Sequence, residues 1–295
     1  EMKEIKIQTN DAGQRLDRFL SKAFPNLKKS AMFKAVRNKK IKVNRKRTTH
    51  DYRLQEGDVI LLFLPPDMLE EKQKSEGVKG DLNVVYEDDS LLVANKPAGL
   101  LSQKDEAGDQ DSLNGRILYY LREKGDWNPE REASFTPSIC HRLDRNTKGL
   151  VIAAKTAEAA RTVNQAIADH QIKKSYLARV QGKMEGHGTL EYWLKKDGTK
   201  ALVKEQPADG YAKAVTHYTV LASSEKSSLV RLDLETGRFH QIRASLAHLG
   251  HPILNDVKYG AAGNSQDLKL QAYRLDLSRC GLDVREPVIE LACEI

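Results

Sequence analysis

Residues 141–154 read HRLDRNTKGLVIAA, a polar cluster that passes through a turn into an apolar strand. Polar side chains beside a core strand need hydrogen-bonding partners or a function. Asp144 lies between two arginines at the entrance to this strand, a position that would expose its carboxylate to a cleft. Two interpretations stay open from the residues alone: Asp144 serves a reaction, or it caps the turn and pairs with Arg145.

Around this stretch, short apolar runs and a few helices follow one another from residue 81 onward. Strands are expected at residues 84–86, 91–94, 150–153, 176–180, 215–221 and 229–234. Tight polar turns such as residues 87–90 favour antiparallel pairing. Amphipathic helices are expected near residues 156–170 and 239–249, the second ended by Gly250. Many short strands with few helices indicate an α+β fold rather than a doubly wound parallel sheet.

The first 66 residues carry all of the net positive charge. The chain has 48 Lys and Arg against 41 Asp and Glu; 16 and 7 of these lie in residues 1–66, which leaves a balance of −2 for residues 67–295. Apolar spacing predicts a helix from residue 16 that Pro25 ends, then a second helix with Ser30 as its cap. Strands are expected at residues 41–43 and 59–64.

This basic segment is a candidate surface for nucleic-acid phosphate, because neutralised phosphates release condensed counterions without any reading of sequence. The alternative is a solvated charged surface that aids solubility. The candidate contacts are Lys28, Lys29, Lys34, Arg37, Lys39, Lys40, Lys42, Arg45, Lys46 and Arg47.

Composition also suggests how the chain divides and where it works. A polar stretch that begins at Pro65 predicts a basic N-terminal domain at residues 1–64, a linker at 65–80 and a second domain at 81–295. No stretch approaches the roughly 20 apolar residues of a membrane span, and the N-terminus lacks a signal-peptide pattern, so we expect a cytoplasmic monomer. The three cysteines, at 140, 280 and 293, are expected to be reduced core residues.

Two further polar clusters lie among the expected strands, KKSY at residues 173–176 and TGRFHQIR at 236–243. Arg243 follows Ile242 on the second helix, so it faces either solvent or a buried carboxylate. The sequence has no glycine-rich dinucleotide loop, no Walker loop and no nucleophile elbow, and its histidines and cysteines lack metal-ligand spacing. We therefore expect no cofactor and no metal.

These motifs together resemble the RluA family of pseudouridine synthases. HRLD at 141–144, with Thr147 and Gly149, resembles the family signature, and residues 236–243 with GHPI at 250–253 resemble its third motif. KPAG at 96–99 resembles the segment that precedes the signature. The N-terminal unit is similar to the αL-type RNA-binding module of a small-subunit ribosomal protein. The resemblance implies a mixed, largely antiparallel sheet with helices at its sides and the cleft across its middle.

The resemblance also implies roles for individual residues. Asp144 would be the catalytic carboxylate, and Arg243 would orient it through a two-point fork. Tyr176 would stack on the target base and assist proton removal from its C5. Arg142, beside Asp144, would fill the space that the flipped base leaves or hold the RNA backbone. Taken without the family, Tyr176 is an ordinary strand tyrosine. The expected phosphate contacts are Arg238, Lys173, Lys174, Lys195 and Lys196.

Pseudouridine formation is an isomerisation, so it needs no redox or nucleotide cofactor. By analogy, the first expected substrate is large-subunit ribosomal RNA, and transfer RNA is the alternative. Other open readings are a non-catalytic RNA-binding or ribosome-assembly factor and a glycosidase acting on free nucleosides. The residues that depart from the family pattern are Lys148, Phe239, Asn255 and Gln271, and they bear on substrate choice.

Overall fold

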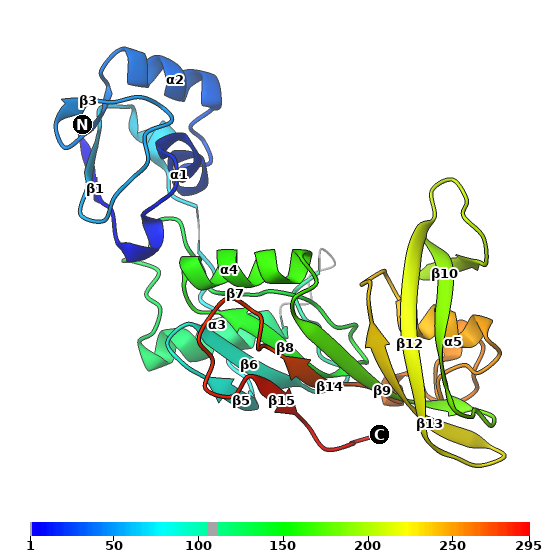
Figure 1. The fold of residues 1–295 in the computed structure, drawn as a ribbon. Coiled ribbons are helices and arrows are strands. Elements are labelled where there is room, and N and C mark those ends of the chain that lie inside the picture. The colour runs from blue at the N-terminus through cyan, green and yellow to red at the C-terminus, as the bar shows by residue number, and fades with distance from the viewer. Residues whose placement is uncertain (1, 73, 106–110) are drawn as a thin grey trace.

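The computed structural model describes residues 2–72, 74–105 and 111–295, and its chain forms a small N-terminal unit and a larger sheet-based unit (Figure 1). The helices of the described residues are α1 (Leu16–Ala23), α2 (Lys29–Arg37), α3 (Leu113–Lys124), α4 (Ala157–Ala168) and α5 (Gln241–His248). Short 3₁₀ helices are η1 (Thr9–Asp11), η2 (Pro66–Leu69), η3 (Val257–Tyr259) and η4 (Ser265–Asp267). Among these helices, none combines the length and the apolar character needed to cross a bilayer.

The N-terminal unit packs α1 and α2 on a small sheet. In the described residues its strands are β1 (Lys3–Lys6), β2 (Ile41–Val43), β3 (Lys46–Arg47) and β4 (Val59–Leu62), in the order β1-β4-β2-β3. The expected helices and strands are confirmed, and the turn after β2 uses left-handed backbone at Asn44 (φ 52°). The predicted cap is wrong: α2 begins at Lys29, so Ser30 lies inside its first turn.

The larger unit is built on one long sheet, with the order β11-β10-β12-β13-β9-β14-β8-β6-β5 in the described residues. Among the described strands of this sheet, only β8 and β14 pair in parallel and the other pairs are antiparallel, which confirms the mixed, largely antiparallel α+β fold. The expected strands are present as β5 (Val84–Glu87), β6 (Leu91–Lys96), β8 (Lys148–Ala154), β9 (Lys173–Gln181), β12 (Ala212–Ser223) and β13 (Ser227–Leu234). Several other strands were missed. These are β7 (Ser138–Ile139), β10 (His187–Asp197), β11 (Lys200–Lys204), β14 (Leu270–Asp276) and β15 (Val288–Glu290).

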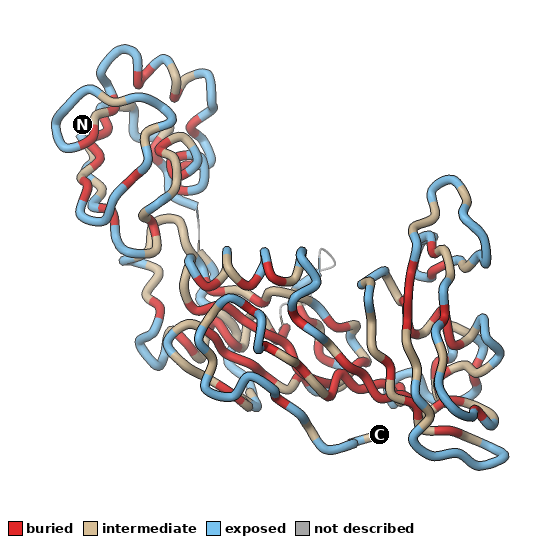
Figure 2. The backbone as a smooth tube through the Cα atoms, viewed as in Figure 1, coloured by how far each residue is buried: buried red, intermediate tan, exposed pale blue. Residues whose placement is uncertain are grey.

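The two faces of β6 and β8 are covered by different helices. Leu92 and Ala94 belong to the core cluster that contains α3, whereas Leu91 and Val93 belong to the cluster that contains α4. Successive residues of a strand point to opposite faces, so a continuous apolar run is what a sheet covered on both sides requires. Figure 2 shows this buried run along the central strands. On the face that carries α3, the same core continues to α5.

Helix α3 was not anticipated. Its segment contains Gly115 and two tyrosines, which weaken the helical signal. The structure explains Gly115, because a Cβ there would lie 3.1 Å from the Val78 side chain. Val78 also donates its N–H to the Gly115 carbonyl at 2.8 Å. The stretch expected as a linker therefore lies against α3, and its other end buries Leu69 in the N-terminal core.

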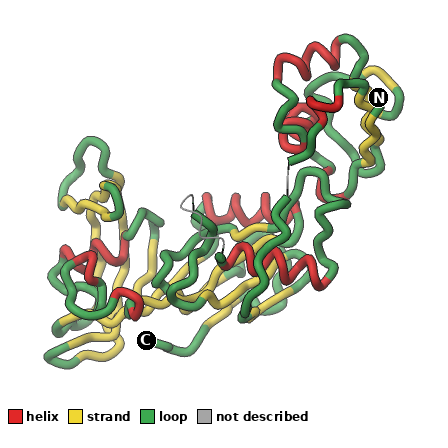
Figure 3. The backbone as a smooth tube through the Cα atoms, turned by 180° about the vertical axis from the view of Figure 1, so that it is seen from behind, coloured by secondary structure: helices red, strands yellow, loops and turns green. Residues whose placement is uncertain are grey.

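Polar contacts join the two units beside α3 and α4, where Figure 3 shows them meeting. Asp11 accepts hydrogen bonds from the backbone N–H and hydroxyl of Ser134, at 3.0 and 2.6 Å. Gln14 donates to the same hydroxyl at 2.8 Å. Asn10 accepts from the N–H of Ala157, the first residue of α4, at 3.1 Å. These bonds fix the N-terminal unit through its 3₁₀ turn.

The cysteines differ in burial. Cys280 is buried and Cys140 is half-buried, as expected of core thiols, and both are free. Cys293 is exposed, so the expectation that it lies in the core is wrong. It lies in the C-terminal segment after β15, outside the helices and strands of the described residues.

Candidate active site

A buried lysine holds the loop that carries Asp144 in place. Lys96, at the end of β6, is completely buried and donates to the carbonyls of Pro97, Leu100 and Arg145 at 3.0, 2.7 and 2.9 Å. Burial lowers the pKa of this lysine to about 7. Since three carbonyls accept from one ammonium group, the segment before α3 and the loop around Asp144 are tied to one point.

A serine and a histidine complete the support of this loop. Buried Ser102 donates to the Leu143 carbonyl at 2.6 Å and accepts the N–H of the same residue at 2.9 Å. His141 accepts the N–H of Ile152 through Nε2 at 3.0 Å. Burial lowers the pKa of His141 to about 3, which keeps the ring neutral and able to accept. The first residue of the HRLD motif is therefore structural.

Gly149 allows the strand after the loop to approach β14. Its φ is +134°, and a Cβ at this position would lie 2.2 Å from the carbonyl oxygen of Ala272. Because β8 and β14 pair in parallel at these two residues, no side chain fits there. The glycine thus places the entrance of β8, and with it Asp144, beside the centre of the sheet.

The second segment of the site is the start of α5, which Gln241 anchors to β12. Buried Gln241 accepts from the Thr236 hydroxyl at 2.7 Å and from the Arg238 N–H at 3.0 Å. Its amide donates to the Val215 carbonyl and the Thr216 hydroxyl at 3.0 and 2.9 Å. Every polar atom of this amide has a partner, so the loop before α5 is fixed. Sequence analysis did not assign a role to Gln241.

Arg243 connects two carboxylates. Its two-point fork binds Asp256, with Nε and one terminal nitrogen 3.0 and 2.8 Å from the two oxygens, and the other terminal nitrogen lies 3.3 Å from Asp144 Oδ2. The expected pairing with Asp144 is present, but the fork expected there goes to Asp256. Burial opposes the charge of Arg243, yet the hydrogen bonds and charge of Asp256, and then the charge of Asp144, raise its pKa. Asp256 is 1% exposed, so the arginine is held before any substrate binds.

His240 is a further neighbour of Asp144 that the residue patterns did not single out. It stands in left-handed backbone before α5 (φ 52°), and its Nε2 lies 3.5 Å from Asp144 Oδ2 and 3.2 Å from Arg243. Its Nδ1 lies 2.8 Å from the Tyr259 hydroxyl, which also accepts the N–H of Ala201. Burial, opposed by the charge of Asp144, lowers the pKa of His240 to about 4, so the ring is neutral near pH 7.

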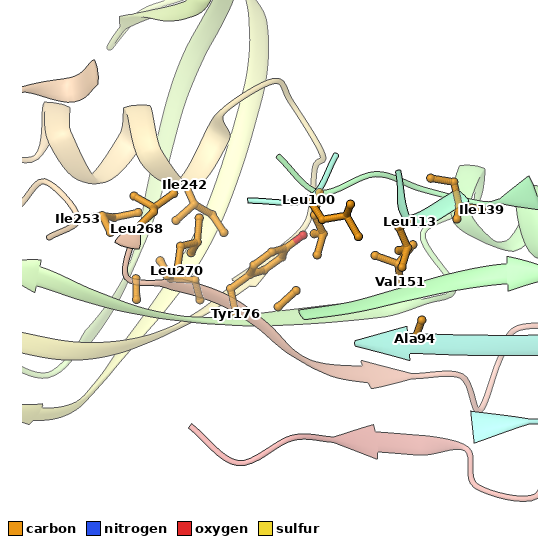
Figure 4. Close-up of a cluster of buried hydrophobic side chains, with 14 of the residues drawn as sticks. Ala94, Leu100, Leu113, Ile139, Val151, Tyr176, Ile242, Ile253, Leu268 and Leu270 are labelled. Atoms are coloured by element: carbon orange, nitrogen blue, oxygen red, sulfur yellow. The ribbon is translucent and has the colours of Figure 1, made fainter. Parts of the chain in front are cut away.

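Tyr176 forms the floor of the site. It lies on β9, and Figure 4 shows its ring between Leu270 and Ile242 on one side and Leu100 on the other. Burial, and then the negative charge of Asp144, raise the pKa of its phenol to about 12. The tyrosine therefore presents a neutral ring.

These side chains surround a pocket of about 430 Å³, a size usual for small-ligand sites. It brings together most of the residues expected from the motifs. Its lining includes Arg142, Asp144, Lys174, Tyr176, Lys196, Arg238, Phe239, His240 and Arg243. The ten basic residues of the N-terminal unit do not line it; Lys42 is half-buried and the other nine are exposed on that unit.

Comparison with known protein families gives two matches. The profile described as RNA pseudouridylate synthase matches residues 90–248, which include the loop that carries Asp144 and the whole of α5. The S4 domain profile matches residues 14–60, which contain the helix pair, β2, β3 and the start of β4.

Individual relatives are similar in sequence to this chain over most of its length. An uncharacterised RNA pseudouridine synthase of Bacillus subtilis (strain 168) is 32% identical, over 91% of this chain and 85% of the relative. The ribosomal large subunit pseudouridine synthase C of Buchnera aphidicola subsp. Schizaphis graminum is also 32% identical, over 87% of this chain and 80% of its own length. The solved structure of human RNA pseudouridylate synthase domain containing 1 shares the fold, with a TM-score of 0.56 at 23% identity over 76% of this chain and 85% of that one.

Proposed function

This chain belongs to the RNA pseudouridylate synthase family, and from that membership we propose that it converts uridines of large-subunit ribosomal RNA to pseudouridine with Asp144 as the catalytic carboxylate. The observation that carries the proposal is the pocket in which Asp144, Arg243 and Tyr176 meet, from three segments far apart in the chain. A relative of similar length is named a ribosomal large subunit enzyme, which supports the choice of RNA.

The reaction requires one oriented carboxylate in the pocket. The bond between uracil N1 and ribose C1′ breaks, the base turns, C1′ bonds to C5, and the C5 proton leaves while N1 gains a proton. Atoms and electrons balance without an oxidant or a second substrate. Asp144 attacks the ribose or removes a ribose proton as positive charge develops near C1′. The Arg243 guanidinium lies 3.3 Å from its Oδ2, so the carboxylate is oriented before the base enters.

Tyr176 supports the flipped base by stacking. A pKa raised to about 12 disfavours the phenolate, so we assign the ring a positioning role and not that of a general base. The base must leave its helix to reach the pocket, which costs a few kcal/mol. Arg142 is exposed at the rim of the pocket, where its guanidinium can occupy the vacated position in the RNA.

The N-terminal unit supplies sequence-independent affinity in this proposal. We propose that residues 1–64 bind RNA through their basic surface, that residues 65–80 connect the units, and that residues 81–295 catalyse. The nine exposed lysines and arginines of the candidate set favour phosphate contact, because each neutralised phosphate releases counterions. We further propose that a monomer acts, because a single chain supplies the residues that line the described pocket.

The test is release of tritium from RNA labelled at C5 of uridine, measured on large-subunit ribosomal RNA and on transfer RNA. The wild type should release tritium from ribosomal RNA, and Asp144→Asn should reduce the rate by at least about 10⁴-fold while RNA binding is retained. Release from transfer RNA alone would replace the substrate in the proposal. Tight binding without release from either RNA would favour a non-catalytic RNA-binding factor, and an active Asp144→Asn variant would refute the role of Asp144.

A further inference from the structure

The hairpin of β10 and β11 carries lysines that are held by aromatic rings. Four of its exposed lysines place the ammonium group over a ring. The pairs are Lys195 with Tyr211 (5.9 Å), Lys196 with Phe239 (4.6 Å), Lys200 with Tyr259 (5.5 Å) and Lys204 with Tyr211 (4.7 Å). Each contact restrains a flexible side chain and leaves its N–H groups to bind an anion.

These lysines differ from others of the same sheet in lacking acidic partners. Lys213 pairs with Glu191 at 3.0 Å, and Lys183 lies near two glutamates. Among the ion pairs of the described residues, none involves the four hairpin lysines. A carboxylate partner neutralises the charge of a lysine, whereas a lysine held by a ring keeps its charge available to an anion.

The hairpin is continuous with the active-site pocket. Lys196 and Phe239 line that pocket. Tyr259, below Lys200, accepts the backbone N–H of Ala201 in β11 and lies 2.8 Å from His240. In Figure 1, β10 and β12 stand beside α5, at the end of the long sheet opposite the N-terminal unit. Two positive surfaces therefore lie on opposite sides of the pocket.

We propose that the β10–β11 hairpin is a second RNA-docking surface, which binds phosphates of the strand that flanks the target uridine. This inference rests on the proposed function and assigns to the hairpin the part of the substrate that lies beyond the pocket, on the side away from the N-terminal unit. Ring-held lysines suit this task because they offer charge in a fixed place without reading base identity. Phe239 adds an apolar face at the junction with the pocket.

The experiment compares three double variants of the full chain. Lys196→Gln with Lys200→Gln, and Lys195→Gln with Lys204→Gln, each remove two hairpin charges. The matched control, Lys183→Gln with Lys226→Gln, removes two exposed charges from the turns beside β9 and β13. These turns lie at the strand ends away from the hairpin turn, because Gln181 pairs with Ser227 and His187 with Thr219, whereas Leu194 pairs with Ala212.

Binding of a fluorescent fragment of large-subunit ribosomal RNA is measured as a function of salt, together with KM and kcat for tritium release. Each hairpin variant should bind at least about tenfold more weakly and raise KM. The slope of log affinity against log salt should become shallower by about 1.4 to 1.8, the value for two phosphates. The control should match the wild type in slope and KM. Equal melting temperatures would establish that the variants are folded.

A hairpin variant with the control's affinity, slope and KM would overturn the inference and point to another partner, such as an acidic protein. Failure of the proposed function is distinguishable, because it would appear as absence of tritium release by the wild type. In that case the salt slopes still decide whether the hairpin binds RNA.

Discussion

Substitution of Asp256 tests whether Arg243 needs its hydrogen bonds to Asp256 to stay in place beside Asp144. Asp256→Asn replaces one oxygen that accepts from Arg243 by an amide group that donates, and it removes the negative charge that faces the fork. Both oxygens now accept, at 2.8 and 3.0 Å, and Asp256 is 1% exposed. Breaking one side of such a buried pair costs about 3–5 kcal/mol of unfolding free energy. At about 2–4 °C per kcal/mol, the melting temperature should fall by about 6–20 °C.

Activity should fall as well, because the freed guanidinium can turn its fork towards Asp144 and change the orientation of the carboxylate. A displacement of about 1 Å at the reacting group corresponds to about a 10²-fold loss of kcat. Urea denaturation and tritium-release kinetics measure the two effects. The control is Asp267→Asn, whose side chain is 57% exposed and pairs with Lys269; it should change stability by no more than about 1 kcal/mol. If Asp256→Asn retained wild-type kcat and stability, our account of Arg243 would be refuted.

Three further substitutions probe the support of the Asp144 loop. Gly149→Ala should lower the free energy of unfolding by more than about 3 kcal/mol in urea denaturation, because its Cβ would meet the backbone of Ala272. The control is Gly57→Ala, which has φ +88° but open space around it and should cost less. Equal losses of unfolding free energy in the two variants would contradict the clash. Buried His141, with its pKa lowered to about 3, should by itself contribute about 1.4 kcal/mol of acid destabilisation per pH unit below pH 6.5, because the unfolded chain binds a proton there that the folded chain does not. His141→Gln should lose about 2 kcal/mol less between pH 6.5 and 5, and a pH dependence equal to the wild type would exclude this residue as the cause. Lys96→Met should lower the unfolding free energy by about 3 kcal/mol or more, since three carbonyls lose their donor; an unchanged melting curve would show that water replaces the ammonium group.

Local pattern was sufficient for much of the fold. Helix α1 and helix α4 were predicted because their apolar residues repeat on one face, and the strands around β8 because apolar runs are bounded by polar turns. Helix α3 was missed because Gly115 and two tyrosines weaken its pattern. Strand β10 was missed because its lysines and half-buried aromatic residues do not alternate clearly. Elements such as α3 and β10 form because segments distant in the chain pack against them. The local sequence pattern does not contain this tertiary packing.

The candidate site divides in the same way. Resemblance of motifs singled out Asp144, Tyr176 and Arg243, and the structure places all three around one pocket. The resemblance did not reveal that the Arg243 fork binds Asp256, or that His240 lies beside the Asp144 carboxylate. Hydrogen bonds from residues tens of positions away decide those orientations.

The sequence by itself determined the two-part organisation of charge, the α+β class and the identity of the motif residues, because these properties belong to short runs of side chains. Only the tertiary structure decided what each motif residue does. His141 became a neutral support and not a catalyst because β8 folds over it. Lys96 and Ser102 became the anchors of the Asp144 loop because the segment after β6 returns beneath that loop. Burial and hydrogen-bonding partners set the charge state and orientation of a side chain, and both arise only when distant segments pack together.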